Sequence, residues 1–214
     1  MSRTEPTRMP ERMSRDRADL DALFESTVLA HIAFIDEDGS PAVVPTAVAR
    51  LGDTVVAHGS TGSRWMRLIA SGIPTAVSLA AVDGVVVARS AFESSLVYTS
   101  GVLFGSWAAL EGDAKEQALR AMTDRLIPGR TAEVRASTKR ELAATTVLGM
   151  PIGEWSLRSS DHWPEDPDED IAGDAWAGVL RYGPSAATVR VHPAPDLRSG
   201  IPEPASIGRV RGVR

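Results

Sequence analysis

The stretch best suited to binding chemistry runs from residue 58 to residue 64 and reads His-Gly-Ser-Thr-Gly-Ser-Arg. Its glycines let backbone N–H groups approach a ligand closely. Arg64 supplies a fixed cationic fork that suits a phosphate. A helix expected directly after it would add a partial positive charge at its N-terminus. The stretch therefore predicts a phosphate cradle with hydroxyls at Ser60, Thr61 and Ser63, and an ordinary Ser/Thr helix cap after a Gly-rich turn is the alternative.

Other catalytic patterns are not found. The stretch lacks the Gly-Lys-Ser/Thr of a nucleotide-binding P-loop and the Gly-x-Ser-x-Gly of a nucleophile elbow. No two of the four histidines have metal-ligand spacing on a helix; these are His31, His58, His162 and His192. His31, in an apolar segment, is expected to be a satisfied core or edge residue rather than a ligand. His162 lies among carboxylates, which favours a solvated acidic loop over a weak metal site.

Composition narrows the function classes further. The 214 residues include no cysteine, which excludes disulfides, thiolate zinc sites, iron–sulfur clusters and cysteine nucleophiles. A net charge of −5 argues against nucleic acid as a partner. No apolar run approaches the roughly 18 residues needed to cross a membrane, and the polar N-terminus lacks the apolar stretch of a secretion signal. We expect a cytoplasmic protein with no nucleic-acid or membrane partner.

The elements that must position the cradle are mostly strands. Alternating and β-branched segments bounded by turn residues predict strands over 28–35, 41–49, 54–58, 74–81, 85–91, 96–110 and 152–158. Helices are expected over 18–26, after Ser63, after Asp113 and after Thr138. Asp83-Gly84 is predicted to be a hairpin turn, and Gly101 and Gly105 to mark bulges or a barrel corner. Many short strands with few helices indicate a mainly β fold, a closed or half-closed barrel with accessory helices.

The chain ends have a different composition. Residues 1–17 are polar and Arg-rich without periodicity, and residues 193–214 are rich in Pro, Gly and Arg. We expect two disordered arms flanking one domain over 18–192, because such segments bury too little apolar surface to offset their ordering entropy. Both arms are predicted to be dispensable for folding.

Four stretches together carry a family resemblance. They are Pro-Ala-Val-Val-Pro-Thr at 41–46, the cradle at 58–64, Asp-Gly-Val-Val-Val-Ala-Arg-Ser-Ala-Phe at 83–92, and Trp-Ala-Gly-Val at 176–179. With them, the chain from about Leu23 to Leu180 resembles the pyridoxamine 5′-phosphate oxidase-like FMN-binding split-barrel family, in the branch that includes nitroimidazole-resistance proteins. The resemblance implies a split β-barrel that holds FMN across the interface of a homodimer.

The resemblance also implies which residues hold the flavin. Ser63 and Arg64 would bind the FMN phosphate, and Arg89 and Ser90 would lie near the cofactor on a neighbouring strand. The full expected cofactor-binding set is Val44, Pro45, Thr46, His58, Ser60, Thr61, Ser63, Arg64, Trp65, Arg89 and Ser90, in which residues 44–46 run beside the flavin ring through backbone contacts. No catalytic residue is assigned, because the cofactor carries the hydride chemistry.

Some residues depart from the family pattern. Trp65 stands where this branch usually has a lysine after the phosphate-binding arginine, so one cationic contact is missing. Trp65 could stack on the flavin or fill the core below the helix, and core packing is favoured. Glu93 and Ser94 replace a usual histidine pair, and Val97-Tyr98-Thr99 replaces an Asn-Tyr-Arg run.

The sequence thus predicts an FMN-dependent oxidoreductase that acts on a small molecule as a homodimer. Trp107, Leu103 and Val102 are expected on the face shared by the two copies. A non-catalytic flavin or ligand binder is one alternative, and a split barrel that uses a deazaflavin or haem is another. No residue identifies the substrate.

Overall fold

The computed structural model describes residues 3–182 together with residues 205 and 207. The tail expected over 193–214 therefore lies outside the described residues apart from those two positions.

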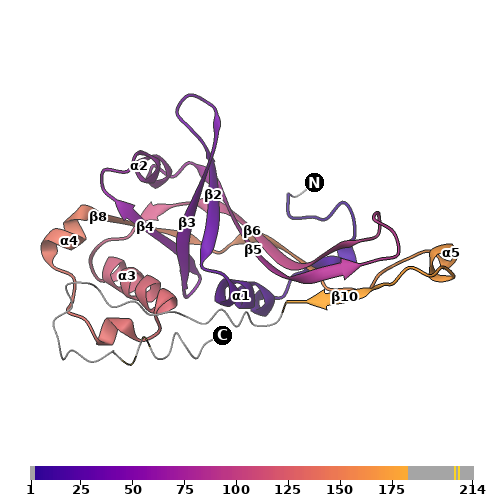
Figure 1. Ribbon diagram of the computed structural model, residues 1–214. Helices are drawn as coiled ribbons and strands as arrows, with labels where there is room; N and C mark the ends of the chain where they lie inside the picture. The colour runs from indigo at the N-terminus through magenta and orange to yellow at the C-terminus, as the bar shows by residue number, and fades with distance from the viewer. Residues whose placement is uncertain (1–2, 183–204, 206, 208–214) are drawn as a thin grey trace.

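One antiparallel sheet dominates the fold (Figure 1). Its strands follow the order β1-β9-β6-β5-β2-β3-β4-β8-β7, and β10 pairs separately with β5. The strands are β1 (Met13–Ser14), β2 (Leu29–Ile35), β3 (Pro41–Leu51), β4 (Thr54–Ser60), β5 (Pro74–Val87), β6 (Ser95–Ser106), β7 (Ala108–Ala109), β8 (Thr145–Pro151), β9 (Glu154–Ser160) and β10 (Gly178–Arg181).

The helices are short and lie outside the sheet. Thr138 and Glu141 form the capping box that the sequence predicted, in which each side chain accepts a hydrogen bond from the other residue's backbone N–H. The helices are α1 (Arg17–Ser26), α2 (Arg64–Ala70), α3 (Gly112–Leu126), α4 (Lys139–Ala144) and α5 (Asp168–Ile171), with 3-10 turns at η1 (Pro10–Arg12) and η2 (Arg130–Ala132).

The main core fills the inside of the curled sheet. Alternate residues of the strands point inward, and their side chains are fully buried; Ile32, Val55, Val77, Leu103, Leu148 and Leu157 represent six strands. Helix α1 closes one side with Leu20, Leu23 and Phe24. The predicted mainly β split barrel with accessory helices is confirmed.

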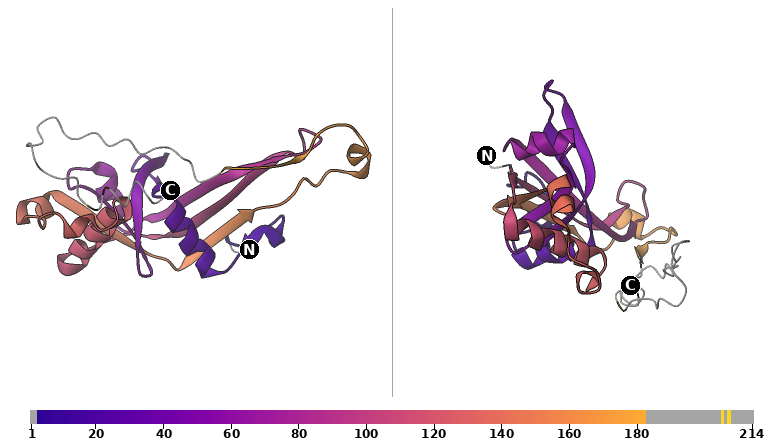
Figure 2. Two further views of the ribbon diagram at one scale, coloured as in Figure 1. Left: turned by 60° about the horizontal axis from the view of Figure 1, so that its bottom comes forward. Right: turned by 90° about the vertical axis from the view of Figure 1, so that its left-hand side faces the viewer.

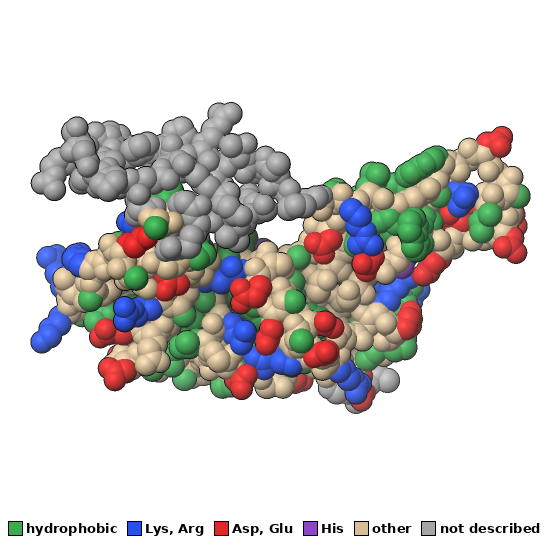
Figure 3. Space-filling view, turned by 90° about the horizontal axis from the view of Figure 1, so that it is seen from below, with side chains coloured by type: hydrophobic (Ala, Val, Ile, Leu, Met, Phe, Trp, Pro, Cys, Tyr) green, Lys and Arg blue, Asp and Glu red, His purple; other side chains and the backbone are tan. Residues whose placement is uncertain are grey.

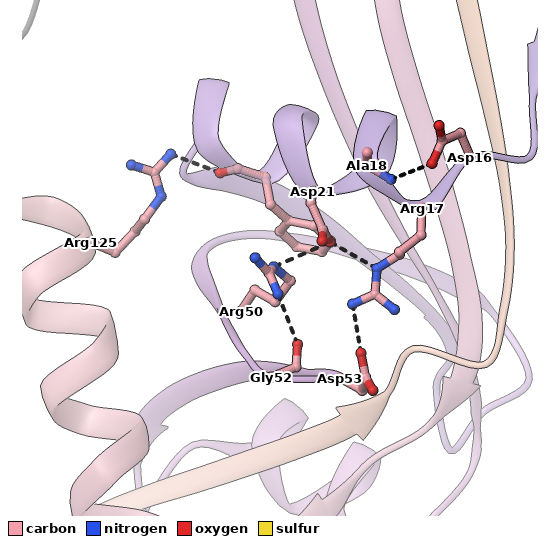
Figure 4. Close-up of polar contacts among 9 residues, drawn as sticks. Asp16, Arg17, Ala18, Asp21, Arg50, Gly52, Asp53 and Arg125 are labelled. Carbon is pink, nitrogen blue, oxygen red and sulfur yellow. Dashed lines mark hydrogen bonds and ion pairs between the residues drawn. The ribbon is translucent and has the colours of Figure 1, made fainter.

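Helix α1 is fixed to the barrel by packing and by charge. Gly101 gives Leu23 room, since a Cβ there would lie 3.0 Å from the leucine side chain. Asp21 lies between two arginines (Figure 4): it accepts a hydrogen bond from Arg17 Nε at 2.8 Å, and Arg50 Nε lies 3.3 Å away. Arg125 of α3 donates to the carbonyl of Phe24 at 2.7 Å. Gly101 therefore serves close packing; of the predicted alternatives, a bulge or a barrel corner, the bulge is wrong here because β6 keeps its register.

Two expectations about the strands are corrected. Residues 74–87 form one strand, and Asp83-Gly84 is a bulge rather than a hairpin turn. At Gly84 an added Cβ would lie 2.1 Å from the carbonyl oxygen of Leu180, so the glycine is needed for the close approach of β10. Residues 145–151, for which no strand was predicted, form β8 beside β4.

The N-terminal segment is docked, which corrects the expectation of an unstructured arm. Strand β1 pairs with β9. The guanidinium of Arg3 lies 4.2 Å from the ring centre of Phe104 and donates to Glu154 at 2.8 Å. Arg12 donates to Glu165 at 2.9 Å. These partners are about 150 residues away along the chain, and no local pattern in the sequence reveals them.

Deletion of residues 1–14 should therefore destabilise the protein, contrary to the sequence-based expectation. The exposed ion pairs contribute little each, but the strand pairing and the cation–π contact add to them, so we expect a loss of about 1–3 kcal/mol. Urea denaturation followed by circular dichroism would measure it. An unchanged midpoint would show that the segment adds nothing to stability.

The molecule is elongated. The barrel with α2, α3 and α4 forms one end, and β5 and β6 run out of it towards β10 and α5 at the other (Figures 1 and 2). Figure 3 shows hydrophobic side chains gathered on this projecting end. Trp176, Leu180 and Tyr182 are each more than half exposed there.

Candidate functional site

The predicted cradle lies where β4 ends and α2 begins. Strand pairing places Ser60 opposite Thr145 of β8. The loop is held by its own backbone: Thr61 N–H donates to the Ala144 carbonyl at 3.1 Å, and Ser63 N–H donates to the Ser60 carbonyl at 2.9 Å. Gly62 N–H donates to the Ser60 hydroxyl at 3.2 Å. The loop N–H groups that the sequence suggested for a ligand are therefore already used within the chain.

Helix α2 begins directly after the cradle loop. It has seven residues, and the side chain of Ser63 makes no capping hydrogen bond. Trp65 packs against the main core, which agrees with the core-packing interpretation, and Met66 is fully buried beneath Gly59. Arg64 and Arg67 are the two cationic side chains that this helix supplies.

Arg64 is exposed but paired. Its side chain is 65% exposed, and its Nη2 donates to the carboxylate of Asp36 in the turn between β2 and β3. Its Nη1 lies 3.7 Å from the Glu37 carboxylate. Arg67, one turn later, donates to the Thr61 carbonyl at 3.3 Å and thereby braces the loop.

The second predicted stretch, Val44, Pro45 and Thr46, lies on β3 beside β2. Pro45 is paired with His31, which in turn faces Ser78 of β5. Since Ile32 is fully buried, His31 points to the opposite, outer face of the sheet, where it is exposed. The expectation that His31 is a core or edge residue is wrong, because β2 lies between β3 and β5 and alternation turns this side chain outward.

The outer face around His31 carries no charged side chain on its immediate neighbours. This face also carries the residues two positions before and after His31 in β2 and alternate residues of the paired strands β3 and β5. All of these are small or apolar. They are Leu29, Ala33, Val43, Pro45, Ala47, Ala76, Ser78 and Ala80.

Arg89 and Ser90 lie beyond the end of β5 and are tied to the chain there. Arg89 N–H and Nη1 donate to Asp166 at 2.8 and 2.9 Å, and the Asp166 side chain is only 1% exposed. The Ser90 hydroxyl accepts from Glu93 N–H at 3.2 Å. Strand β5, with 14 residues, separates Arg89 from the α2 end of the barrel, a length of roughly 45 Å when extended. One copy of the chain therefore does not bring Arg64 and Arg89 together.

Two further histidines differ in their surroundings. Neighbouring atoms partly desolvate the ring of His58 and lower its pKa, which favours the neutral imidazole, although the residue remains at the surface. The Nδ1 of His162 lies 2.8 Å from the carbonyl of Trp163. Its Nε2 is buried and has no hydrogen-bond partner among the described residues. His162 is thus more enclosed than a solvated acidic loop would allow.

The described part of the chain offers neither a cluster of metal-binding side chains nor a membrane-spanning helix. Residues 3–182, with 205 and 207, contain no group of three or more His, Cys, Asp or Glu side chains that could hold a metal ion. Within these residues no helix has both the length and the apolar character needed to cross a bilayer. Two cavities, one between α3 and α4 and one beneath the N-terminal segment, are not lined by Arg64.

Fold and site together define a split-barrel protein with an arginine-bearing loop where β4 meets α2. The family model for pyridoxamine 5′-phosphate oxidase matches residues 16–159, which is more than half of the chain. The chain therefore belongs to the pyridoxamine 5′-phosphate oxidase family, as its sequence motifs predicted. A comparison with curated proteins gave no match.

Solved structures support the same assignment. The FAD and heme binding protein from Mycobacterium smegmatis is 49% identical, with 94% of this chain and 97% of that chain covered and a TM-score of 0.85. The flavocytochrome Anf3 from Azotobacter vinelandii is 30% identical, with 98% and 96% covered and a TM-score of 0.88. A 5-nitroimidazole antibiotic resistance protein from Bacteroides thetaiotaomicron is 14% identical over 68% of this chain and 84% of that chain, with a TM-score of 0.57, and shows the fold alone.

Proposed function

We propose that this protein is a homodimeric flavocytochrome: it binds a flavin and a haem and acts as an oxidoreductase on a small molecule. The observation that carries the proposal is the 49% identity, over nearly the whole of both chains, to a protein named for FAD and haem binding. The 30% identical relative is named a flavocytochrome. The sequence-based prediction gave haem as an alternative to FMN, and here haem is proposed in addition to the flavin.

The flavin proposed here is FAD. The sequence motifs favoured FMN, but the M. smegmatis relative is named for FAD. Arg64 would bind a phosphate of either flavin, because it is the charged side chain at the cradle and lies at the surface. Mass spectrometry of the flavin released from purified protein decides between FAD and FMN.

The separation of Arg64 from Arg89 supports the homodimer. If both arginines serve one flavin, the second must come from another copy of the chain. The outer sheet face offers apolar surface for such a contact: Leu29, Ile35 and Val43 are each at least half exposed. Sedimentation should show a dimer at micromolar concentration, and a monomer would contradict this part of the proposal.

His31 is the residue we propose as the haem ligand. Its imidazole is exposed on a sheet face whose neighbouring side chains are small or apolar, and such a face leaves room for a planar macrocycle. The Nε2 of His162 is enclosed by protein, and His58 lies beside the cradle assigned to flavin. A haem held by one histidine supplies one-electron chemistry, and a flavin exchanges electrons in ones or twos.

The absorbance spectrum of the purified full-length protein tests these assignments. Wild type should show flavin bands and a haem Soret band. His31→Ala should lose most of the Soret band, keep its flavin, and recover haem binding with added imidazole. His162→Ala is the matched control and should keep both cofactors. Loss of the Soret band in His162→Ala but not in His31→Ala would refute the ligand assignment, and a wild-type protein without flavin would refute the proposed function.

Oxidoreductase activity has its own test. NADH or NADPH should bleach the flavin bands under anaerobic conditions, and an electron acceptor should restore them. A flavin that no donor reduces would support the alternative of a non-catalytic binder. The absence of cysteine fits the reducing cytoplasm, where we place the protein; nucleic acid and membranes are not among its proposed partners.

A further inference from the structure

The arginine assigned to the flavin phosphate already faces carboxylates. Asp36 is the main one: its side chain is only 14% exposed and accepts from Arg64 Nη2. The Glu37 carboxylate lies 3.7 Å from Nη1 of the same guanidinium. A phosphate that binds Arg64 must therefore approach at least one carboxylate or displace it.

The hairpin turn fixes the position of Asp36. Its N–H donates to the Ser40 carbonyl at 2.8 Å, and Gly39 N–H donates back to the Asp36 carbonyl at 2.9 Å. Its Oδ1 accepts from Glu37 N–H at 2.8 Å, which leaves Oδ2 for Arg64. Because three contacts belong to the turn itself, the carboxylate remains beside Arg64 when a ligand arrives.

Local charge at the cradle is therefore negative in spite of Arg64. Residues 36–38 are all acidic. Hydrogen bonds from Ser40 lower the pKa of Asp38, so this third carboxylate is ionised at neutral pH. The other cation of α2 is Arg67, and its guanidinium already donates to the Thr61 carbonyl.

The negative charge around the cradle affects the binding of FMN and of FAD differently. FMN ends in a phosphate monoester, whose second proton dissociates with a pKa near 6, so at pH 7 this group carries close to two negative charges. The FAD pyrophosphate has a similar total charge, but it is divided between two phosphorus atoms that carry one negative charge each, so the phosphate in contact with Arg64 carries one charge and the second charge lies farther from the hairpin. Repulsion from Asp36 is therefore larger for FMN than for FAD at the same contact with Arg64.

We propose that Asp36 is a specificity-determining residue that makes the cradle select FAD over FMN. The proposal rests on the proposed flavin function. It requires only that a flavin phosphate binds near Arg64 and that the hairpin carboxylate stays in place.

An exchange experiment tests it on the full-length protein. Wild type and Asp36→Asn are incubated with equimolar FAD and FMN, freed of unbound flavin, and the bound flavins are quantified by chromatography. Asparagine keeps the Oδ1 acceptor for Glu37 N–H but removes the charge. Because FMN bears about one more charge beside the carboxylate, Asp36→Asn should raise the bound FMN-to-FAD ratio roughly three- to tenfold.

Two controls isolate the charge effect. Glu169→Gln makes the same change in net charge on α5, at the far end of the molecule (Figure 1), and should leave the ratio unchanged. Riboflavin has no phosphate, so its affinity should be equal in wild type and Asp36→Asn. Melting curves confirm that the variants are folded.

Three outcomes would overturn the proposal. An unchanged ratio in Asp36→Asn would mean that the carboxylate does not discriminate. Weaker binding of both nucleotides would mean that Asp36 instead holds Arg64 in place for the phosphate. Failure of wild type to take up either flavin would refute both the proposed function and this inference. A wild type that binds flavin, with an unchanged ratio in Asp36→Asn, would refute this inference alone.

Discussion

Arg64→Ala should weaken flavin binding about ten- to a hundredfold. The variant removes the cation at the start of α2, and the neighbouring position cannot replace it because Trp65 packs against the core. A charge-assisted hydrogen bond to a phosphate is worth about 1.5–3 kcal/mol, and that range gives the expected loss. Titration of the flavin-free protein with the flavin, followed by fluorescence quenching, measures the two dissociation constants.

Arg67→Ala is the matched control for this experiment. It removes an equal charge from the same helix, but its exposed guanidinium is held by a hydrogen bond to the Thr61 carbonyl. We expect a small change in affinity for this variant, well below that of Arg64→Ala. Equal affinity in Arg64→Ala and wild type would show that the phosphate binds elsewhere, and a larger loss in Arg67→Ala would transfer the role to that residue.

The sequence predicted well those features that depend on residues close together along the chain. The cradle loop, the strands on either side of it and the capping box at Thr138 all depend on residues within a few positions. Alternation of apolar residues likewise identified β2 and β4. The place of the loop between a strand and a helix was predicted correctly, but the hydrogen bonds that occupy its N–H groups were not, because one partner is the Ala144 carbonyl on a distant segment.

Features that depend on distant partners were missed. Asp83-Gly84 has the residue types of a hairpin turn, yet Leu180 of β10 lies against it and the strand continues. Polar composition suggested a free N-terminal segment, but its arginines find carboxylates at Glu154 and Glu165. In each case the deciding contact joins residues that are about a hundred or more positions apart, and a single sequence does not show such pairs.

The surroundings of Arg89 show that the position of a site residue also depends on distant partners. A resemblance to the family placed it near the flavin, and in one copy of the chain it is held by the buried Asp166. This contact fixes the loop after β9 to the end of β5. If Arg89 contacts a flavin held at Arg64, it must do so from a second copy of the chain. Cofactor binding at this site would then depend on dimer formation.

The largest loss of stability is expected for Trp107→Ala. The sequence-based prediction put Trp107 and Leu103 on a face shared by two copies, but both side chains are buried in the core of one copy, at 1% and 0% exposure. Trp107 Nε1 donates to the hydroxyl of Thr75 at 3.0 Å, and that hydroxyl donates to the Gly105 carbonyl at 3.0 Å. Removing the indole therefore opens a cavity and takes a donor from a buried polar chain.

The expected cost is about 3–5 kcal/mol, the range for truncating a buried aromatic residue. Small domains have about 5–15 kcal/mol in total, so a large part of the folded population could be lost. Trp176→Ala is the control, because that side chain is 65% exposed, and it should change stability by less than about 0.5 kcal/mol. Denaturant titration monitored by circular dichroism gives the two free energies of unfolding. A loss below about 1 kcal/mol for Trp107→Ala would mean that the indole does not fill the barrel core, because a fully buried aromatic side chain cannot be removed so cheaply.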